Sequence, residues 1–253
     1  MSGRLRVILF LAAAAAFGWG LLDALAGIPP FGDYRGPYGD VVLQTMGELR
    51  HTQQGVAAVT FDYRGFDTLG EEFILFAAVA GALLLMRRQP SEKERGAHDQ
   101  APGHPAARIG PACRVSGLIM FPFTLLLGIY VVLHGHLSPG GGFQGGVLLA
   151  SAFYFVYLSG EFEDLASFVK EHPVELTESA GAAAFALLAA IPLLLGEPCM
   201  KNILPFGEKG ELLSSGMLPL FNIAVGIEVG AGFLLLVHAF LKQVLLIRKE
   251  GKK

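Results

Sequence analysis

The chain has 253 residues, of which 53% are hydrophobic and only 16% are charged, and its formal net charge is −3. A soluble domain of this length covers one core with a charged surface, so this composition and a mean hydropathy of +0.51 exclude that class. No basic patch indicates a nucleic-acid partner. The two cysteines, Cys113 and Cys199, lie far apart without a Cys-x-x-Cys pattern, so we predict no disulfide, zinc site or iron–sulfur centre.

Six apolar runs each approach the ~20 residues that a helix needs to cross about 30 Å of hydrocarbon. They cover residues 7–26, 68–86, 115–135, 140–159, 177–196 and 217–241. The excess of Lys and Arg on one side predicts the orientation. With the N-terminus in the cytoplasm, 14 of the 19 basic residues fall inside and only five fall outside, namely Arg35, Arg50, Arg64, Lys201 and Lys209. We therefore predict an all-α, multi-pass protein of the cell (inner) membrane with both termini cytoplasmic.

The first apolar run has two interpretations. A basic start, an apolar centre and the sequence Ala24-Leu25-Ala26, which resembles a cleavage site, are features of a signal peptide. The length of the run favours an uncleaved membrane anchor instead, because signal peptides have shorter apolar centres. We expect the anchor, and cleavage would leave the direction of the other five helices unchanged.

Residues 89–107 are polar, contain three prolines and lack an apolar period, which is typical of a linker. They divide the chain into a two-span part at 1–88, a cytoplasmic linker at 89–114 and a four-span domain at 115–253. Two short helices are also expected at the membrane surfaces. Val56, Val59 and Tyr63 recur at i, i+3 and i+7 on the outer side. Residues 161–175 mix charged and apolar residues on the inner side and are expected to leave the helix near Pro173.

The connection between the third and fourth runs is the most specific motif in the chain. Residues 134–146 read HGHLSPGGGFQGG and leave almost no room for a loop between two membrane crossings. Irregular backbone at membrane depth is tolerated only where protein buries it or where it lines a wet cavity. Glycines permit positive φ and close approach of other backbone, and we assign that structural role to Gly140, Gly141, Gly142, Gly145 and Gly146.

This motif closely resembles the signature of the MnhB-type subunit of Mrp-type multisubunit cation/proton antiporters, and NIAVGIEVGAG at 222–232 is similar to the same family. The resemblance to the MnhB-type subunit covers about 115–246. Residues 61–71, FDYRGFDTLGE, are similar to the segment that ends the A-type subunit of these antiporters. Related membrane-bound hydrogenase and sulfur-reductase complexes carry that segment as a separate small subunit. This second resemblance covers about 39–88, so the chain looks like a fusion of two neighbouring subunits.

The resemblance implies an accessory, non-catalytic subunit in a multisubunit Na⁺/H⁺ antiporter or a related ion-pumping respiratory complex. Its implied partners are other polytopic subunits, its transported ions Na⁺ and H⁺, and it implies no cofactor or small-molecule substrate. The alternatives are an energy-coupling subunit of a membrane-bound hydrogenase or sulfur reductase, or a self-sufficient channel. The sequence has no mid-membrane lysine and no inverted repeat, which disfavours a complete transporter. It also lacks a nucleophile–base pair, a metal cluster or a phosphate loop, which disfavours an enzyme.

Two carboxyl groups are candidates for an ion pathway. Glu228 falls near the middle of the sixth run, where a charge costs roughly 2.5–3.5 kcal/mol on insertion scales. It either binds a proton or Na⁺, or is neutralised by a hydrogen bond or a partner's lysine. Glu71 matches the acidic residue of the family motif, but Thr68-x-x-Glu71 also reads as a capping box. Family members more often carry an apolar residue where Glu72 stands, so that second carboxyl group is a departure from the pattern.

Four further polar residues are pathway candidates. His134 and His136 titrate near neutral pH and suit a proton relay, or they hydrogen-bond the carbonyls of the interrupted helix. They do not form a metal site, because no further ligands cluster near them. Gln144 either satisfies the same carbonyls or faces a cavity. Asn222 shares a helix face with two glycines, which predicts close packing and an interhelical hydrogen bond.

Overall fold

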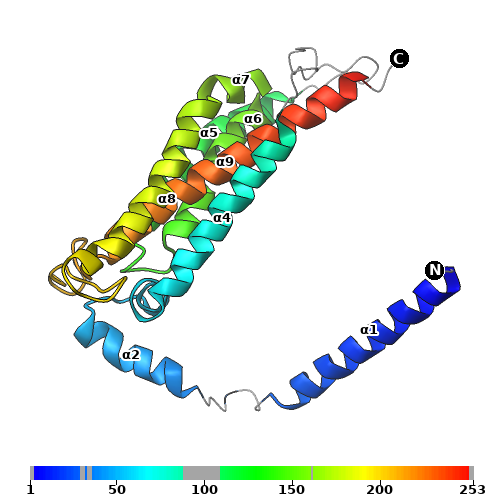
Figure 1. Cartoon of the computed structure of the whole chain (residues 1–253). Coiled ribbons are helices and arrows are strands. Elements are labelled where there is room, and N and C mark those ends of the chain that lie inside the picture. Colours follow the sequence, from blue (N-terminus) through cyan, green and yellow to red (C-terminus); the bar gives the residue numbers. More distant parts are fainter. Residues whose placement is uncertain (1–2, 29–31, 33–35, 88–108, 161, 251–253) are drawn as a thin grey trace. The chain divides into compact units, whose positions relative to one another are not determined.

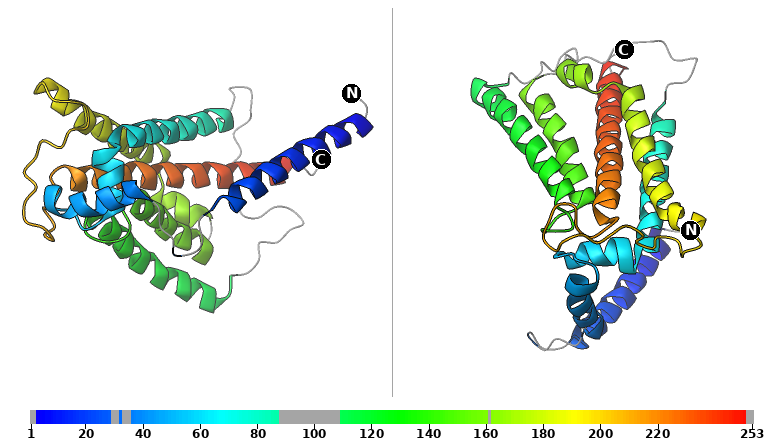
Figure 2. Two further views of the ribbon diagram at one scale, coloured as in Figure 1. Left: turned by 90° about the horizontal axis from the view of Figure 1, so that it is seen from below. Right: turned by 90° about the vertical axis from the view of Figure 1, so that its left-hand side faces the viewer.

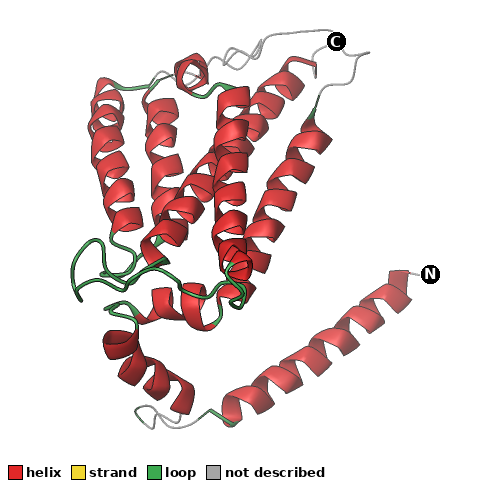
Figure 3. Cartoon of the chain, turned by 60° about the vertical axis from the view of Figure 1, so that its left-hand side comes forward, coloured by secondary structure: helices red, strands yellow, loops and turns green. Residues whose placement is uncertain are grey.

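The computed structural model describes residues 3–28, 32, 36–87, 109–160 and 162–250. Within these residues the chain forms helices and loops and no strand (Figures 1 and 3). Six described helices are long and apolar enough to cross a membrane. They are α1 (Gly3–Ala26), α4 (Gly65–Met86), α5 (Pro111–Leu133), α6 (Gly142–Ser159), α8 (Glu171–Leu194) and α9 (Leu218–Glu250). The six predicted spans and the all-α class are therefore confirmed.

The chain divides into two compact units, Met1–Val41 and Val42–Lys253. The first unit contains α1 and the start of α2 (Pro37–Leu49). No residue of the membrane-spanning window of α1 is buried, and large side chains such as Phe17 and Trp19 are exposed. A helix that is apolar on every face needs an apolar environment around it, from lipid or from other proteins.

The second unit is a bundle of α4, α5, α6, α8 and α9, with α9 in the centre (Figure 2). In the most apolar window of α9, 67% of the residues are buried, against 11% in that of α4. Phe221 of α9 lies between Phe61 and Phe185, with ring centroids 5.7 and 5.0 Å away. Apolar residues therefore surround α9 on several sides, and its buried polar residues, Asn222, Glu228 and His238, face protein rather than lipid.

Glycines set how closely the helices approach α9. A Cβ atom at Gly146 of α6 would lie 2.8 Å from Cβ of Val229, and one at Gly181 of α8 would lie 2.9 Å from Cβ of Glu228. Real Cβ atoms do not approach so closely, so a larger residue would push the helices apart. Small residues at such crossings are the usual means of tight packing in membrane proteins.

Four shorter helices lie outside the spans. The expected outer helix is present as α3 (Gly55–Ala58) followed by a π-helical turn, η1 (Val59–Tyr63). Its neighbour α2 was missed, because the sequence before residue 56 shows no clear apolar period. The expected inner helix is present as α7 (Phe162–Phe168). The expectation that Pro173 ends a helix is wrong, because Pro173 lies in the first turn of α8, where a missing N–H breaks no helical hydrogen bond.

The bundle has two distinct ends. We call the end that carries α7, the start of α8 and the last described turns of α9 the α7 end (Figure 1). We call the opposite end, formed by the segments 51–54, 134–141 and 195–217, the loop end. Most of the predicted linker, residues 88–108, lies outside the described residues, and α5 begins at Pro111, four residues before the predicted boundary. The division into domains stays a prediction.

Candidate ion-binding site

The glycine-rich motif forms a tight turn at the loop end. The helix α5 ends at Leu133 and α6 begins at Gly142. Gly140 and Gly141 have φ values of +133° and +140°, which L side chains rarely adopt. A Cβ atom at Gly135 would lie only 2.7 Å from Cα of Gly141. The glycines therefore permit both the backbone conformation and the close contact across the turn.

Asn222 of α9 closes this turn from the inside. Its Oδ1 accepts a hydrogen bond of 2.8 Å from the N–H of Gly142, and its Nδ2 donates to the carbonyl of Leu218 at 3.0 Å. Asn222 is completely buried. It thus provides, from another helix, the capping acceptor that the first turn of α6 lacks in its own segment. This is the interhelical hydrogen bond expected of Asn222, whereas a role in ion transport stays a prediction.

The two histidines of the motif have different environments. His134 is half-buried, its Nδ1 lies 3.0 Å from the carbonyl oxygen of Tyr130, and its ring stacks on that of Tyr130. His136 is completely buried, and its carbonyl accepts hydrogen bonds from Thr52 and Gln53. Burial lowers the pKa of His136, and the nearby backbone of residues 211 and 212 opposes that shift. The ring of His134 thus lies close to a backbone carbonyl, as one of the two interpretations of the histidines expected. The backbone carbonyl of His136 instead binds the segment 51–54.

Gln144 is exposed on the first turn of α6, and a Cβ atom at Gly141 would lie 3.3 Å from its Oε1. The three side chains differ in burial, because His136 is completely buried, His134 is half-buried and Gln144 is exposed. The structure therefore separates three of the predicted pathway residues, and their roles in transport stay predictions.

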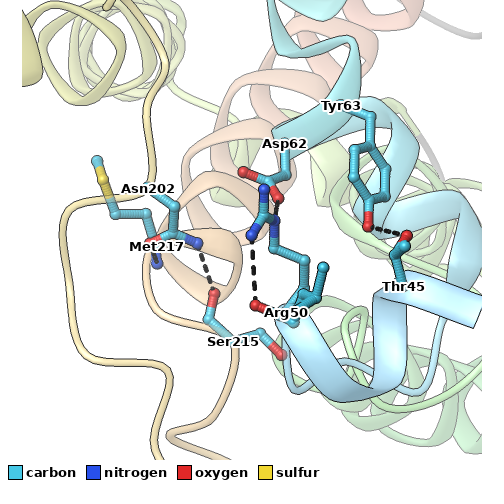
Figure 4. Close-up of polar contacts among 8 residues, drawn as sticks. Thr45, Arg50, Asp62, Tyr63, Asn202, Ser215 and Met217 are labelled. Carbon is cyan, nitrogen blue, oxygen red and sulfur yellow. Dashed lines mark hydrogen bonds and ion pairs between the residues drawn. The ribbon is translucent and has the colours of Figure 1, made fainter. Parts of the chain in front are cut away.

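A polar cover lies over the loop end (Figure 4). Arg50 forms an ion pair with Asp62, and its guanidinium lies 5.6 Å from the centre of the Tyr63 ring. The hydroxyls of Thr45 and Tyr63 are 2.6 Å apart. Asn202 donates to the carbonyl of Ser215 and accepts from the N–H of Met217. Burial raises the pKa of Asp62, while Arg50 opposes the shift. These contacts fix the segments that cover the bundle.

Three carboxyl groups lie inside the bundle at the junction of α4, α8 and α9. Glu228 of α9 is 0% exposed, Glu178 of α8 is 4% exposed and Glu72 of α4 is 6% exposed. The side chains of Glu72 and Glu178 both interact with that of Glu228. Glu178 lies over Gly232, one turn along α9 from Glu228, and a Cβ atom at Gly232 would lie 3.2 Å from its Oε1. We call these three residues the carboxyl cluster.

The carboxyl cluster has no cationic partner within the described part of the chain. None of its members forms an ion pair with a described Lys, Arg or His. Both oxygens of Glu228, Oε2 of Glu72 and Oε1 of Glu178 are buried, and no N–H or hydroxyl group of the described residues donates a hydrogen bond to them. The carboxyl groups of Glu72 and Glu228 hydrogen-bond each other, which requires a proton on one of the two. An unpaired carboxylate is costly inside a membrane bundle. These groups are therefore held protonated or are neutralised by a bound ion.

The arrangement of the cluster is not that of a resident metal centre. Among the described residues, no group of three or more His, Cys, Asp or Glu side chains could hold a metal ion. The carboxyl groups instead follow one another along the helices. Such an order permits a proton to be held by one group at a time.

The structure places Glu71 and Glu72 in opposite environments. Glu71 is exposed on the outer surface of α4, whereas Glu72 is buried in the cluster. The predicted capping box is wrong: α4 begins at Gly65, so Thr68 already lies in its first turn, and its hydroxyl donates to the carbonyl of Thr60. Sequence reasoning treated Glu72 only as a departure and did not consider Glu178. The start of α8 at Glu171, six residues before the predicted span, places Glu178 two turns inside the helix.

Long apolar helices that enclose unpaired carboxyl groups define the class of this protein, a multi-pass membrane protein of ion transport. A family model described as a domain related to the MnhB subunit of Na⁺/H⁺ antiporter matches residues 112–235. The chain therefore contains an MnhB-related domain at 112–235, which confirms the resemblance to the MnhB-type antiporter subunit. It is a membrane subunit of a cation/proton antiporter or of a related complex. The fusion with an A-type segment at about 39–88 stays a prediction.

Relatives differ in how much of their length the chain matches. An uncharacterized protein of Methanocaldococcus jannaschii is 32% identical over 192 residues, which are 70% of this chain and 72% of that protein. A probable K⁺/H⁺ antiporter A/B subunit of Rhizobium meliloti is 31% identical over 47% of this chain but 13% of its own length. A putative antiporter subunit mnhB2 of Staphylococcus aureus is 34% identical over 35% of this chain and 61% of its own length.

Two solved structures share the fold. A chain of the membrane-bound sulfane sulfur reductase, an archaeal respiratory membrane complex, matches with a TM-score of 0.71 and 28% identity, over 94% of this chain and 99% of that chain. A chain of the Mrp complex from Dietzia sp. matches with a TM-score of 0.72 and 19% identity, over 96% of this chain and 26% of that chain. The second match shows a shared fold alone.

Proposed function

We propose that this chain is a non-catalytic subunit whose carboxyl cluster binds a proton or a monovalent cation during transport by a larger membrane complex. Glu228 carries this proposal, because it is completely buried in the central helix and, among the described residues, its only side-chain partners are other carboxyl groups. Ionisable groups in such positions are costly and mark ion and proton pathways. Glu72 and Glu178 supply further acceptors beside it.

The host we propose is a redox-driven respiratory complex of the kind represented by the sulfane sulfur reductase. The match to the reductase chain extends almost from end to end, over 94% of this chain and 99% of that chain. The matched chain of the Mrp complex is covered over only 26% of its own length, and the named antiporter relatives over 13% and 61% of theirs. An end-to-end match supports the same division of the machinery into subunits. Electron transfer would then occur in partner subunits, and this chain would contribute to ion translocation.

The second candidate host is a Na⁺/H⁺ antiporter without redox subunits, which the antiporter-related domain at 112–235 supports. Purification of the intact complex from its native membrane discriminates between the hosts. Iron–sulfur signals in paramagnetic resonance, with the matching subunits in mass spectrometry, are expected for the redox-driven host. A complex made only of polytopic subunits would favour the antiporter.

We also propose that both termini lie in the cytoplasm, in the inner membrane of the cell. The excess of basic residues on that side supports this orientation. The α7 end would then face the cytoplasm and the loop end would face outward.

The experiment that tests the transport role is Glu228→Gln in the assembled complex. Glutamine preserves size and polarity but cannot exchange a proton, so we expect transport by reconstituted vesicles to fall about a hundredfold or more. Native gel electrophoresis should show normal assembly. Glu197→Gln is the control, because Glu197 lies in the loop after α8, where it pairs with Lys201. Transport at the normal rate by the Glu228 variant would overturn the proposal.

A further inference from the structure

We propose that a proton path runs along the seam between α8 and α9, from an entrance at the α7 end to Glu228. The entrance is the group formed by Glu171, His238 and Lys242, which we call the entrance group. The inference rests on the proposed function, because the path needs Glu228 as the group that receives the proton. It adds the side from which the proton comes and the residues that deliver it.

The register of the two helices places the polar residues at successive levels of one seam. The helices α8 and α9 run antiparallel. Gly181 lies against Glu228, and Glu178 lies over Gly232. Further toward the α7 end, Oε1 of Glu171 lies 3.6 Å from Nε2 of His238. The ionisable groups therefore follow one another along a single interface from the end of the bundle to its interior.

The entrance group connects the exterior of the bundle to this interface. The Glu171 carboxyl group pairs with the ammonium group of Lys242 as well as with His238, and its side chain is half exposed. The side chain of His238 is only 6% exposed. An imidazole has an ordinary pKa of about 6.5, so it gains and loses protons in the physiological range. Within the entrance group, Glu171 is thus in contact with solvent, whereas His238 is buried in the seam.

Carboxyl groups continue the path along α8. Glu171 and Glu178 are spaced at i and i+7 and share one face of the helix. Glu178 in turn interacts electrostatically with Glu228. Glu175 is exposed, lies 4.0 Å from His172 and is not part of the path. A proton passes from the entrance group to Glu178 and then to Glu228. Each donor becomes its conjugate base and regains a proton from the entrance side, so charge is conserved at every transfer.

A completely buried leucine separates the two polar levels on α9. Leu235 lies three residues from His238 and seven from Glu228 and is 1% exposed. An apolar constriction passes polar species only when water enters it, which is how hydrophobic gates work in channels. Leu235 therefore prevents free leakage between the entrance group and the carboxyl cluster.

The spacing of the ionisable groups favours a proton over a metal cation. A cation such as Na⁺ needs several oxygen ligands together, and the described His, Cys, Asp and Glu side chains form no group of three that could hold a metal ion. A proton needs one acceptor at a time, which the seam offers at each level.

The test uses His238→Gln in the reconstituted complex, with His172→Gln as a matched control. The two histidines lie at the same end of the bundle, but the side chain of His172 is 82% exposed and that of His238 is 6% exposed. Transport is measured across the range from about pH 5.5 to 8. We expect His238→Gln to slow transport and to remove the part of the pH dependence that imidazole titration produces, while the control keeps the normal profile.

Glu178→Gln is the second variant and keeps the inference testable if His238→Gln fails to assemble. We expect it to slow transport about a hundredfold, with normal assembly on native gels. Normal rates and pH profiles in both variants, combined with loss of transport in Glu228→Gln, would overturn the seam path and leave the proposed function intact. Normal transport in Glu228→Gln would overturn both.

Discussion

The glycine-rich turn and the carboxyl cluster are both polar regions of an apolar bundle, but their polar atoms have different hydrogen-bond partners. At the turn, the N–H of Gly142 is bound by Asn222, and the carbonyl of His136 is bound by Thr52 and Gln53. In the cluster, no N–H or hydroxyl group of the described residues donates to Glu228, whose side-chain partner is the carboxyl group of Glu72. Polar groups with complementary donors and acceptors stabilise a unique packing, whereas buried carboxyl groups paired only with one another are typical of proton or ion sites. The contacts of the turn are those of a structural element, and the cluster is the part for which we propose a transport role.

The largest effect is expected for a substitution of Glu228, and it tests the difference between the carboxyl cluster and the glycine-rich turn directly. Replacing Glu228 by leucine should abolish transport, as for glutamine, but should leave thermal stability in detergent unchanged or raise it. The reason is that burying two adjacent carboxyl groups costs free energy that a single hydrogen bond between them offsets only in part, whereas an apolar side chain of similar size has no such cost. The thermal midpoint of the purified complex and the transport rate of vesicles are the two measurements. A large drop in the midpoint would show that Glu228 is a structural residue.

Asn222→Ala should give the opposite pattern. It leaves the N–H of Gly142 without an acceptor and opens a small void, which should cost about 1–3 kcal/mol of stability. Some transport should survive in the fraction that assembles, because the carboxyl cluster stays in place. Thermal unfolding followed by light scattering measures the loss. Normal stability combined with lost transport would instead show that Asn222 takes part in the ion pathway.

The same contrast explains what could be predicted from the sequence. The spans follow from apolar runs near 20 residues, and the turn follows from glycines whose conformations other residues rarely adopt, as Gly140 and Gly141 show. The cluster could be predicted only in part. Glu228 stands out because it interrupts an apolar run at its middle, but Glu178 is placed inside the bundle only because α8 begins as early as Glu171. Which of the adjacent Glu71 and Glu72 faces inward depends on helix packing.

Packing also decides which polar residues become buried in loops. His136 and His134 are equivalent in the sequence pattern, but the segment 51–54, which is distant in the sequence, covers His136 alone. No local signal predicts that contact. The predicted capping box failed for a related reason, since the start of α4 at Gly65 depends on the preceding π-helical turn and not on Thr68 itself.

The buried histidine predicts how the loop end responds to pH. Burial lowers the pKa of His136 below its ordinary value of 6.5, so the unfolded chain binds this proton more tightly than the folded chain. Its contribution to stability is therefore complete above about pH 6.5 and is lost as the pH falls through the lowered pKa. Thermal midpoints in detergent should fall between neutral and mildly acid pH, and His136→Asn should reduce that dependence.

Asp62 provides an internal control for this assignment. Burial raises its pKa above the ordinary value of 3.8, so the folded chain binds the Asp62 proton more tightly and gains relative stability on acidification. The two groups thus change stability in opposite directions. A pH dependence unaltered in His136→Asn would contradict the assignment to His136.

The smallest effect on the chain itself is expected for Glu71→Gln. Glu71 is exposed, and the hydroxyl of Thr68 is engaged by Thr60, so the substitution should change the stability of the isolated chain by less than about 0.5 kcal/mol. A carboxyl group on the outer face of a membrane helix needs a partner there, so we expect fewer copies of the other membrane subunits to co-purify with the variant. Quantitative mass spectrometry of the purified complex measures that ratio, with Glu197→Gln as the control. Lower stability of the isolated chain with unchanged co-purification would instead assign Glu71 a role within α4 itself.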